Sequence, residues 1–193
     1  MKTLKRSSSI SKSLSLAVAG IVLLTAGSAV AASYCYTFSG PAPGTSHTVG
    51  DTLTPTGSTV EFLQFQWSSG TWTPDGVATV VLSNNANGLA NELNLNNINL
   101  RVIPDTPALT ASFKYADFGG NVNLGVNGDL RNTNDMMDLD GAVVGGCDIE
   151  VTETVAVGHV FGEVDIICPD PVVIDRFGMG GQEFFVDGIC FED

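Results

Sequence analysis

Short stretches of alternating apolar and polar residues run along the chain from Tyr34 to Phe191, and clusters of Gly, Pro, Asn and Asp separate them. A period of two is typical of β-strands that bury one face. Beyond the first thirty-odd residues, no segment shows the spacing of a long amphipathic helix. We therefore expect an all-β domain of roughly eight to ten strands.

The segment between Cys147 and Cys168 predicts a β-hairpin that turns at Val157–Gly158. In this register Ile149 faces Ile166, so that one face of the hairpin is apolar and the other polar. The two cysteines then lie directly opposite each other. We expect them to form a cross-strand disulfide.

The chain has four cysteines, an even number, which favours two disulfides in an exported protein. If Cys147 bonds to Cys168, then Cys35 must bond to Cys190. This second bond would join the first predicted strand, Tyr34 to Phe38, to the last, Glu183 to Phe191.

A second hairpin is predicted from Leu109 to Leu130 about the pair Gly119–Gly120, which can adopt the positive φ angles of a tight turn. Phe113 would lie opposite Val126 on its apolar face. The parity of the apolar positions also changes near Asn96–Asn97, which predicts a one-residue bulge in a single strand.

Two hairpins with polar backs predict sheets that are covered on one side only. An antiparallel two-sheet β-sandwich, similar to a jelly roll, is the favoured architecture. A small closed β-barrel is the alternative, because both bring the first and last strands together.

Residues 1–31 have the pattern of a signal peptide, with a basic start, an apolar stretch from Leu14 to Ala26 and the cleavage site Ala29–Val30–Ala31. A retained membrane anchor is the alternative, but the small residues favour cleavage. The mature chain, 32–193, is then a single disulfide-stabilised domain that is not embedded in a membrane. The leader is bacterial in style, so we expect a secreted or periplasmic protein.

Beyond the leader the chain has four basic and 21 acidic residues, a net charge of −17. Nucleic acid is excluded as an expected partner, because binding it requires Lys and Arg at the phosphates. Solubility outside the cell is the simplest explanation of the charge. Binding of divalent cations or life in a saline medium is the alternative.

Four carboxylates share the polar back of the first hairpin, and Glu150 and Asp165 lie directly opposite each other in its register. Like charges across a β-ladder repel, so the side chains either splay into water or bind a cation. Calcium, which prefers several carboxylate oxygens, is the cation we would expect here. The candidate metal ligands are Asp148, Glu150, Glu163 and Asp165.

Trp67 and Trp72 are candidate ligand-binding residues. As core residues they would only fill space, but exposed tryptophans would indicate a platform for stacking sugars. Gly70–Thr71–Trp72 is similar to the Gly-x-Trp signature of lipocalins, barrels that carry small apolar ligands. It lies too far along the chain for that signature, and we interpret it as coincidence.

Catalysis finds little support in the sequence. A Gly-x-Ser-x-Gly motif is absent, the cysteines are assigned to disulfides, and His47 and His159 lie in isolation. We therefore expect a non-enzymatic module with a structural or adhesive role at the cell surface or in a matrix. Its partner would be a second copy or a surface component, and it needs no cofactor apart from the calcium considered above. A binding protein for an apolar ligand or carbohydrate is the second hypothesis, and a small hydrolase the third.

Overall fold

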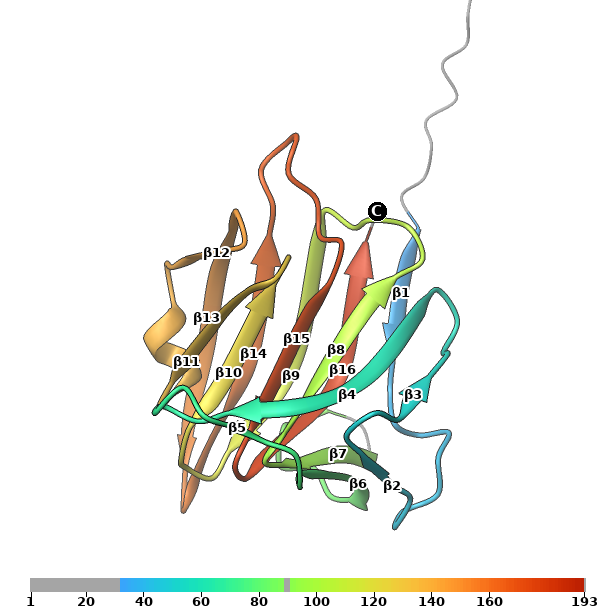
Figure 1. The fold of residues 1–193 in the computed structure, drawn as a ribbon, viewed down its shortest axis with the longest axis vertical. Helices are drawn as coiled ribbons and strands as arrows, with labels where there is room; N and C mark the ends of the chain where they lie inside the picture. Colours follow the sequence, from blue (N-terminus) through green and yellow to red (C-terminus); the bar gives the residue numbers. More distant parts are fainter. Residues whose placement is uncertain (1–31, 89–90, 193) are drawn as a thin grey trace, which may run out of the picture. The chain divides into compact units, whose positions relative to one another are not determined.

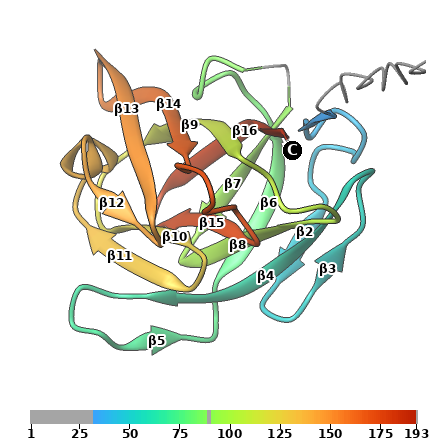
Figure 2. The same ribbon diagram turned by 90° about the horizontal axis from the view of Figure 1, so that it is seen from above.

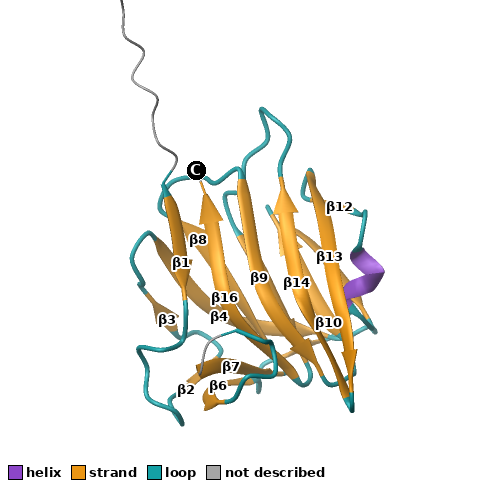
Figure 3. Cartoon of the chain, turned by 180° about the vertical axis from the view of Figure 1, so that it is seen from behind, coloured by secondary structure: helices purple, strands orange, loops and turns teal. Residues whose placement is uncertain are grey.

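The computed structural model describes residues 32–88 and 91–192, so the predicted signal peptide lies outside the described residues. Two antiparallel sheets are stacked face to face and do not close into a barrel. Figure 1 shows the smaller sheet in front of the larger one, Figure 3 shows the larger sheet from behind, and Figure 2 shows the two layers from above. The sandwich prediction is confirmed, and the barrel alternative is wrong.

One sheet has nine strands. Eight of them follow one another, and β1 pairs with β16 beside the part of β16 that pairs with β7. In spatial order its other strands and their bounds are β12 (Val143–Val144), β13 (Cys147–Ala156), β14 (His159–Ile167), β9 (Thr110–Asp117), β16 (Phe184–Glu192), β7 (Asn91–Asn96), β6 (Val77–Leu82) and β2 (Ser46–Thr48), while β1 is Ser33–Tyr36.

The second sheet has seven strands, with the short β5 (Trp72–Thr73) pairing with the far end of β4. The others, in spatial order, are β11 (Asp129–Thr133), β10 (Val122–Val126), β15 (Phe177–Gly181), β8 (Ile98–Pro104), β4 (Ser58–Gln66) and β3 (Thr52–Leu53). A single 3-10 turn, η1 (Met136–Leu139), joins β11 to β12.

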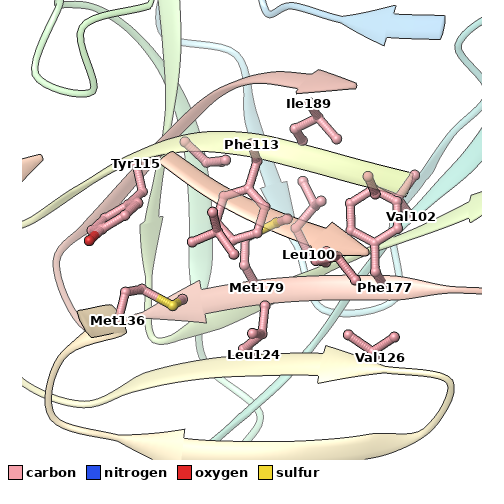
Figure 4. Packing of buried hydrophobic residues seen from close by; sticks show 14 of the residues in the cluster. Leu100, Val102, Phe113, Tyr115, Leu124, Val126, Met136, Phe177, Met179 and Ile189 are labelled. Atoms are coloured by element: carbon pink, nitrogen blue, oxygen red, sulfur yellow. The ribbon is translucent and has the colours of Figure 1, made fainter. Parts of the chain in front are cut away.

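The hydrophobic core lies between the two sheets. It forms because alternate side chains of each strand point toward the facing sheet. In β9, Ala111, Phe113 and Tyr115 point inward, while residues between them are half-buried. Figure 4 shows Phe113 over Met179 of the facing sheet, with Tyr115 and Met136 of η1 at one end. Burying side chains of this size contributes about 2 kcal/mol each, so the inward alternation holds the two layers together.

Both predicted disulfides are present, Cys35–Cys190 and Cys147–Cys168. The register of β13 and β14 is the predicted one, with Ile149 opposite Ile166 and Glu150 opposite Asp165. Two such bonds are consistent with an oxidising extracellular or periplasmic environment.

The predicted hairpin about Gly119–Gly120 is wrong. β9 pairs with β14 and β16 in one sheet, whereas β10 pairs with β11 and β15 in the other, so Gly119–Gly120 carries the chain from one sheet to the facing sheet. Both strands send their apolar faces into the same core, and this produced the apparent match between Phe113 and Val126. The true hairpin of β10 turns at Asn127–Gly128, both with positive φ.

The predicted bulge at Asn96–Asn97 is also a passage between sheets. β7 ends at Asn96 in the nine-stranded sheet and β8 begins at Ile98 in the seven-stranded sheet, with Asn97 at φ 56° between them. The parity of apolar residues changes because the core lies on the other side of the next strand. The glycine-rich segment before the last strand is β15 (Phe177–Gly181), in the middle of its sheet.

Among the described residues, no helix is long and apolar enough to cross a membrane.

Candidate functional site

The far end of β4 forms an arm that crosses the outer face of the seven-stranded sheet. β4 pairs with β8 as far as Gln64, and then with β5 at Phe65 and Gln66. Figure 1 shows this end of β4 passing in front of the lower ends of β15 and β10, and Figure 2 places β5 on the outside. We call residues 63–73 the β4–β5 arm.

A ladder of asparagine amides fixes the arm to the sheet. Asn123 donates to Asn99 Oδ1 at 3.1 Å, and Asn132 donates to Asn123 Oδ1 at 2.6 Å. The ends of the ladder reach the arm itself, because Asn99 donates to the carbonyl of Gln64 and Asn132 to that of Gln66, both at 2.8 Å. Asn99 and Asn123 are buried, so their hydrogen bonds are protected from water.

Gly180 of β15 lies between Asn99 and Asn123 in the sheet register, and the amide ladder passes over it. A Cβ at this position would collide with Asn99 Oδ1 and with the carbonyl of Ile98. We expect Gly180→Ala to lower the free energy of unfolding by about 2 kcal/mol, because the collision is with backbone and a buried amide.

Urea unfolding of Gly180→Ala beside Gly125→Ala measures this effect. Gly125 faces the same side of the neighbouring strand, but its nearest contact would be Leu130 Cδ1 at an ordinary 3.4 Å. Equal unfolding midpoints for the two variants would contradict the assigned role of Gly180.

One row further along the sheet, two glycines leave a groove in the outer face. Gly178 and Gly125 are cross-strand partners, with Arg101 on one side and Leu130 on the other. Since neither glycine has a side chain, the surface is hollowed between Arg101 and Leu130. The cavity has a volume of about 160 Å³. We call it the glycine groove.

The β4–β5 arm supplies the second wall of the groove through Leu63 and Trp72. Leu63 is half-buried and points outward, whereas its neighbour Phe62 is buried in the core. The side-chain parity changes between Phe62 and Phe65, where β4 leaves β8 for β5.

The two tryptophans have different places. Trp72 lines the glycine groove and is 46% exposed. Trp67 is half-buried, with its ring edge-on to Phe65 at a centroid distance of 5.5 Å, and it does not line the groove. Only Trp72 therefore offers a free aromatic face at this site.

Two of the charged side chains that line the groove are held in ion pairs. Arg101 donates through Nε to Glu61 Oε2 at 2.7 Å and contacts it again through Nη2. Asp129, another lining residue, accepts from Arg131 at 2.9 Å. The third charged residue that lines the groove, Arg176, stands at its end beside Gly128. The groove thus combines an apolar floor with fixed donors and acceptors at its rim.

The carboxylates predicted as metal ligands lie on the outer face of the nine-stranded sheet, away from the groove. Glu150 faces Asp165 across the ladder, and burial together with the nearby Glu163 raises the pKa of Asp165. Asp148 is exposed two residues before Glu150. In residues 32–88 and 91–192, no group of three or more His, Cys, Asp or Glu residues is placed to hold a metal ion.

A further acidic group lies at the C-terminal end of β9, the other end from the strand's pairing with Asp165. Asp117 is 4% exposed and accepts from the Gly119 N–H at 2.8 Å, while the Tyr115 hydroxyl donates to Glu153 at 3.1 Å. Burial raises the pKa of Asp117 to about 6, and the charge of Asp135 adds to the rise. The pKa of Glu153 is raised for the same two reasons.

The histidines are separate from these sites. His47 stacks on the core residue Phe62, and His159 stacks on Phe118, each at a centroid distance of 4.6 Å. Neither lines the glycine groove.

Sequence reasoning identified Trp72 but missed the rest of the groove, which consists mainly of Leu63, Gly125, Gly178, Leu130 and the two arginines. One signal was present: Gly125 and Gly178 each interrupt a run of strand-forming residues, which indicates a place where something approaches the sheet closely. Without the correct pairing of β10 with β15, the two glycines could not be brought together.

No protein-family model matches the chain, and no curated protein matches it significantly.

Proposed function

We propose that this domain is an exported, non-catalytic adhesive module that binds carbohydrate in the glycine groove. The observation that carries the proposal is the exposed Trp72 beside a floor of two glycines and a rim of fixed polar groups.

The chemistry of a sugar matches these parts. A pyranose ring has an apolar face of C–H groups, which packs on an aromatic ring, and a rim of hydroxyls, which need donors and acceptors. Trp72 and Leu63 supply the apolar contact. Arg101 supplies donors and Asp129 acceptors, and each is held in place by an ion pair, with Glu61 and Arg131 respectively.

The site is also rigid before any ligand arrives. The asparagine ladder fixes the β4–β5 arm over the sheet, so the position of Trp72 relative to Gly125 is set by buried hydrogen bonds. Preorganisation of this kind raises affinity, because less side-chain and loop entropy is lost on binding. An adhesive module must hold its target from a small contact area, and a rigid groove favours that.

The other two functions fit the structure less well. An apolar ligand inside a barrel would need an interior space, whereas the space between these sheets is filled by packed side chains (Figure 4). A hydrolase would need two free carboxylates across a cleft. Asp129, which lines the groove, is held by Arg131, and Glu61, which does not line it, is held by Arg101.

We expect Trp72→Ala to weaken carbohydrate binding about 30-fold, because loss of a central aromatic contact commonly costs about 2 kcal/mol. Affinity electrophoresis of the mature domain through gels containing one polysaccharide each, drawn from glucans, mannans, xylans and galacturonans, measures the retardation. Wild type should be retarded by at least one polysaccharide, and Trp72→Ala by none.

Two further variants distinguish the groove from other surfaces. Gly125→Val fills the floor without a backbone collision, since a Cβ there would meet only Leu130 Cδ1 at 3.4 Å and the Asp129 carbonyl at 3.8 Å. It should abolish retardation while unfolding near the wild-type midpoint. Phe118→Ala removes an aromatic ring that is 37% exposed elsewhere and should bind normally. Retardation lost in Phe118→Ala and kept in Gly125→Val would place the site elsewhere and refute the proposal.

A further inference from the structure

The basic side chains of the described chain are few, and two of them meet at one place. Beyond the predicted leader the sequence has four basic residues, and of these Arg101 and Arg176 line the glycine groove. The guanidinium of Arg101 is neutralised by Glu61. Within residues 32–88 and 91–192, Arg176 forms no ion pair, so its positive charge faces the groove without a compensating carboxylate.

The backbone of Arg176 is held in place by the turn between β10 and β11. Asn127, at φ 51°, donates its N–H to the Arg176 carbonyl at 2.9 Å, and its Oδ1 accepts from the Asp175 N–H at 2.9 Å. Its side-chain amide also donates to the Val173 carbonyl at 2.7 Å. Hydrogen bonds to Val173, Asp175 and Arg176 fix the point from which the Arg176 side chain extends.

Gly128 makes room for the guanidinium. It follows Asn127 at φ 88°, and a Cβ there would lie 3.0 Å from Arg176 Nη2, closer than side chains normally approach. The Asn127–Gly128 pair therefore makes the tight turn and also leaves room for the Arg176 side chain at the end of the groove.

We infer that the ligand of the glycine groove is an acidic sugar, whose carboxylate pairs with the Arg176 guanidinium while its ring packs on Trp72. This inference rests on the proposed function and names its substrate class as glycans that contain uronic acid. A planar carboxylate can accept two parallel N–H bonds from arginine, which a sugar hydroxyl cannot.

The high negative charge of the domain does not oppose this at the groove. The cluster Asp148, Glu150, Glu163 and Asp165 lies on the outer face of the other sheet. Stacked sheets are about 10 Å apart, and charges at that distance are largely screened at physiological ionic strength. The field at the groove is set mainly by groups close to it.

Titration calorimetry with a galacturonic acid hexasaccharide and with its methyl ester tests the inference, because the two probes share the same sugar rings and esterification removes the charge of the carboxyl groups. Wild type should bind the acid about tenfold more tightly than the ester. Arg176→Gln should lose this preference and keep the affinity for the ester. Lys114→Gln, which removes a basic side chain from β9 in the other sheet, should keep the preference.

Each result bears on one of the two proposals. Equal affinities for acid and ester, or a preference that survives in Arg176→Gln, would overturn the acidic-sugar inference and leave a carbohydrate module. Binding of a neutral polysaccharide alone would do the same. If no polysaccharide of any class binds wild type, the proposed function fails, and this inference fails with it.

Discussion

Removing the disulfide between the chain ends, by Cys35→Ser together with Cys190→Ser, is expected to lower the free energy of unfolding by about 5 kcal/mol. The two residues are 155 positions apart, so the bond closes nearly the whole domain into one loop. It therefore strongly lowers the conformational entropy of the unfolded chain. It also retains β1, a strand of four residues that pairs with β16 alone. Urea unfolding of the oxidised protein, followed by tryptophan fluorescence, measures the loss.

The second disulfide provides the matched comparison. Cys147 and Cys168 are only 21 positions apart. Replacing both by serine should lower the free energy of unfolding by about 3 kcal/mol. They also join two strands that share a long ladder, from Asp148↔Ile167 to Ala156↔His159, which persists without the bond. A larger loss from the short loop than from the long one would contradict the entropic account of the Cys35–Cys190 bond.

The part of the fold that could be predicted from sequence is the part in which neighbours in the chain are neighbours in space. The β13–β14 hairpin has its turn, its apolar face and its cysteines within one segment, so a single register satisfies all three. The Cys35–Cys190 bond then followed by elimination. Neither prediction required knowledge of which strands lie in which sheet.

Strand pairing across a turn could not be predicted in the same way. An alternating strand shows which of its sides faces the core, but a partner beside it and a partner across the core give the same alternation. Gly119–Gly120 was therefore interpreted as a hairpin turn when it connects facing sheets. The better signal was Asn127–Gly128, since an Asn-Gly pair between apolar runs is the strongest local indication of a tight turn.

The glycine groove could not be assembled from sequence because it depends on three separate pairings. Gly125 lies in β10, Gly178 in β15 and Trp72 in β5, and the arm reaches the sheet only through the asparagine ladder. Glycines in a strand suggest a loop when read locally. In the middle of a sheet, they mark the places where an amide ladder or a ligand occupies the space of a side chain.

Asp117→Asn is expected to stabilise the domain by about 3 kcal/mol near pH 7.5 and to have no effect near pH 4. The pKa of Asp117 is raised to about 6 by burial at the end of β9, so the folded state holds its proton more tightly than the unfolded chain. The contribution of Asp117 to the free energy of unfolding is fully present below its unfolded-state pKa near 4. This contribution is lost as the pH rises through the folded-state pKa of about 6. An asparagine remains neutral throughout, and its Oδ1 can still accept from the Gly119 N–H.

Thermal unfolding of wild type and Asp117→Asn between pH 4 and pH 8 measures the difference, and Asp105→Asn, in an exposed turn, serves as the matched loss of one charge. Wild type should become less stable as the pH rises from 4 to 8. Asp117→Asn should keep part of this dependence of stability on pH, because the pKa values of Glu153 and Asp165 are also raised. Equal stabilisation by Asp117→Asn at both ends of the range would contradict the assignment, since a group that does not titrate between them cannot change the slope. Acidification should thus stabilise this acidic domain through carboxyl groups that are partly withdrawn from water and do not line the glycine groove, independently of its ligand.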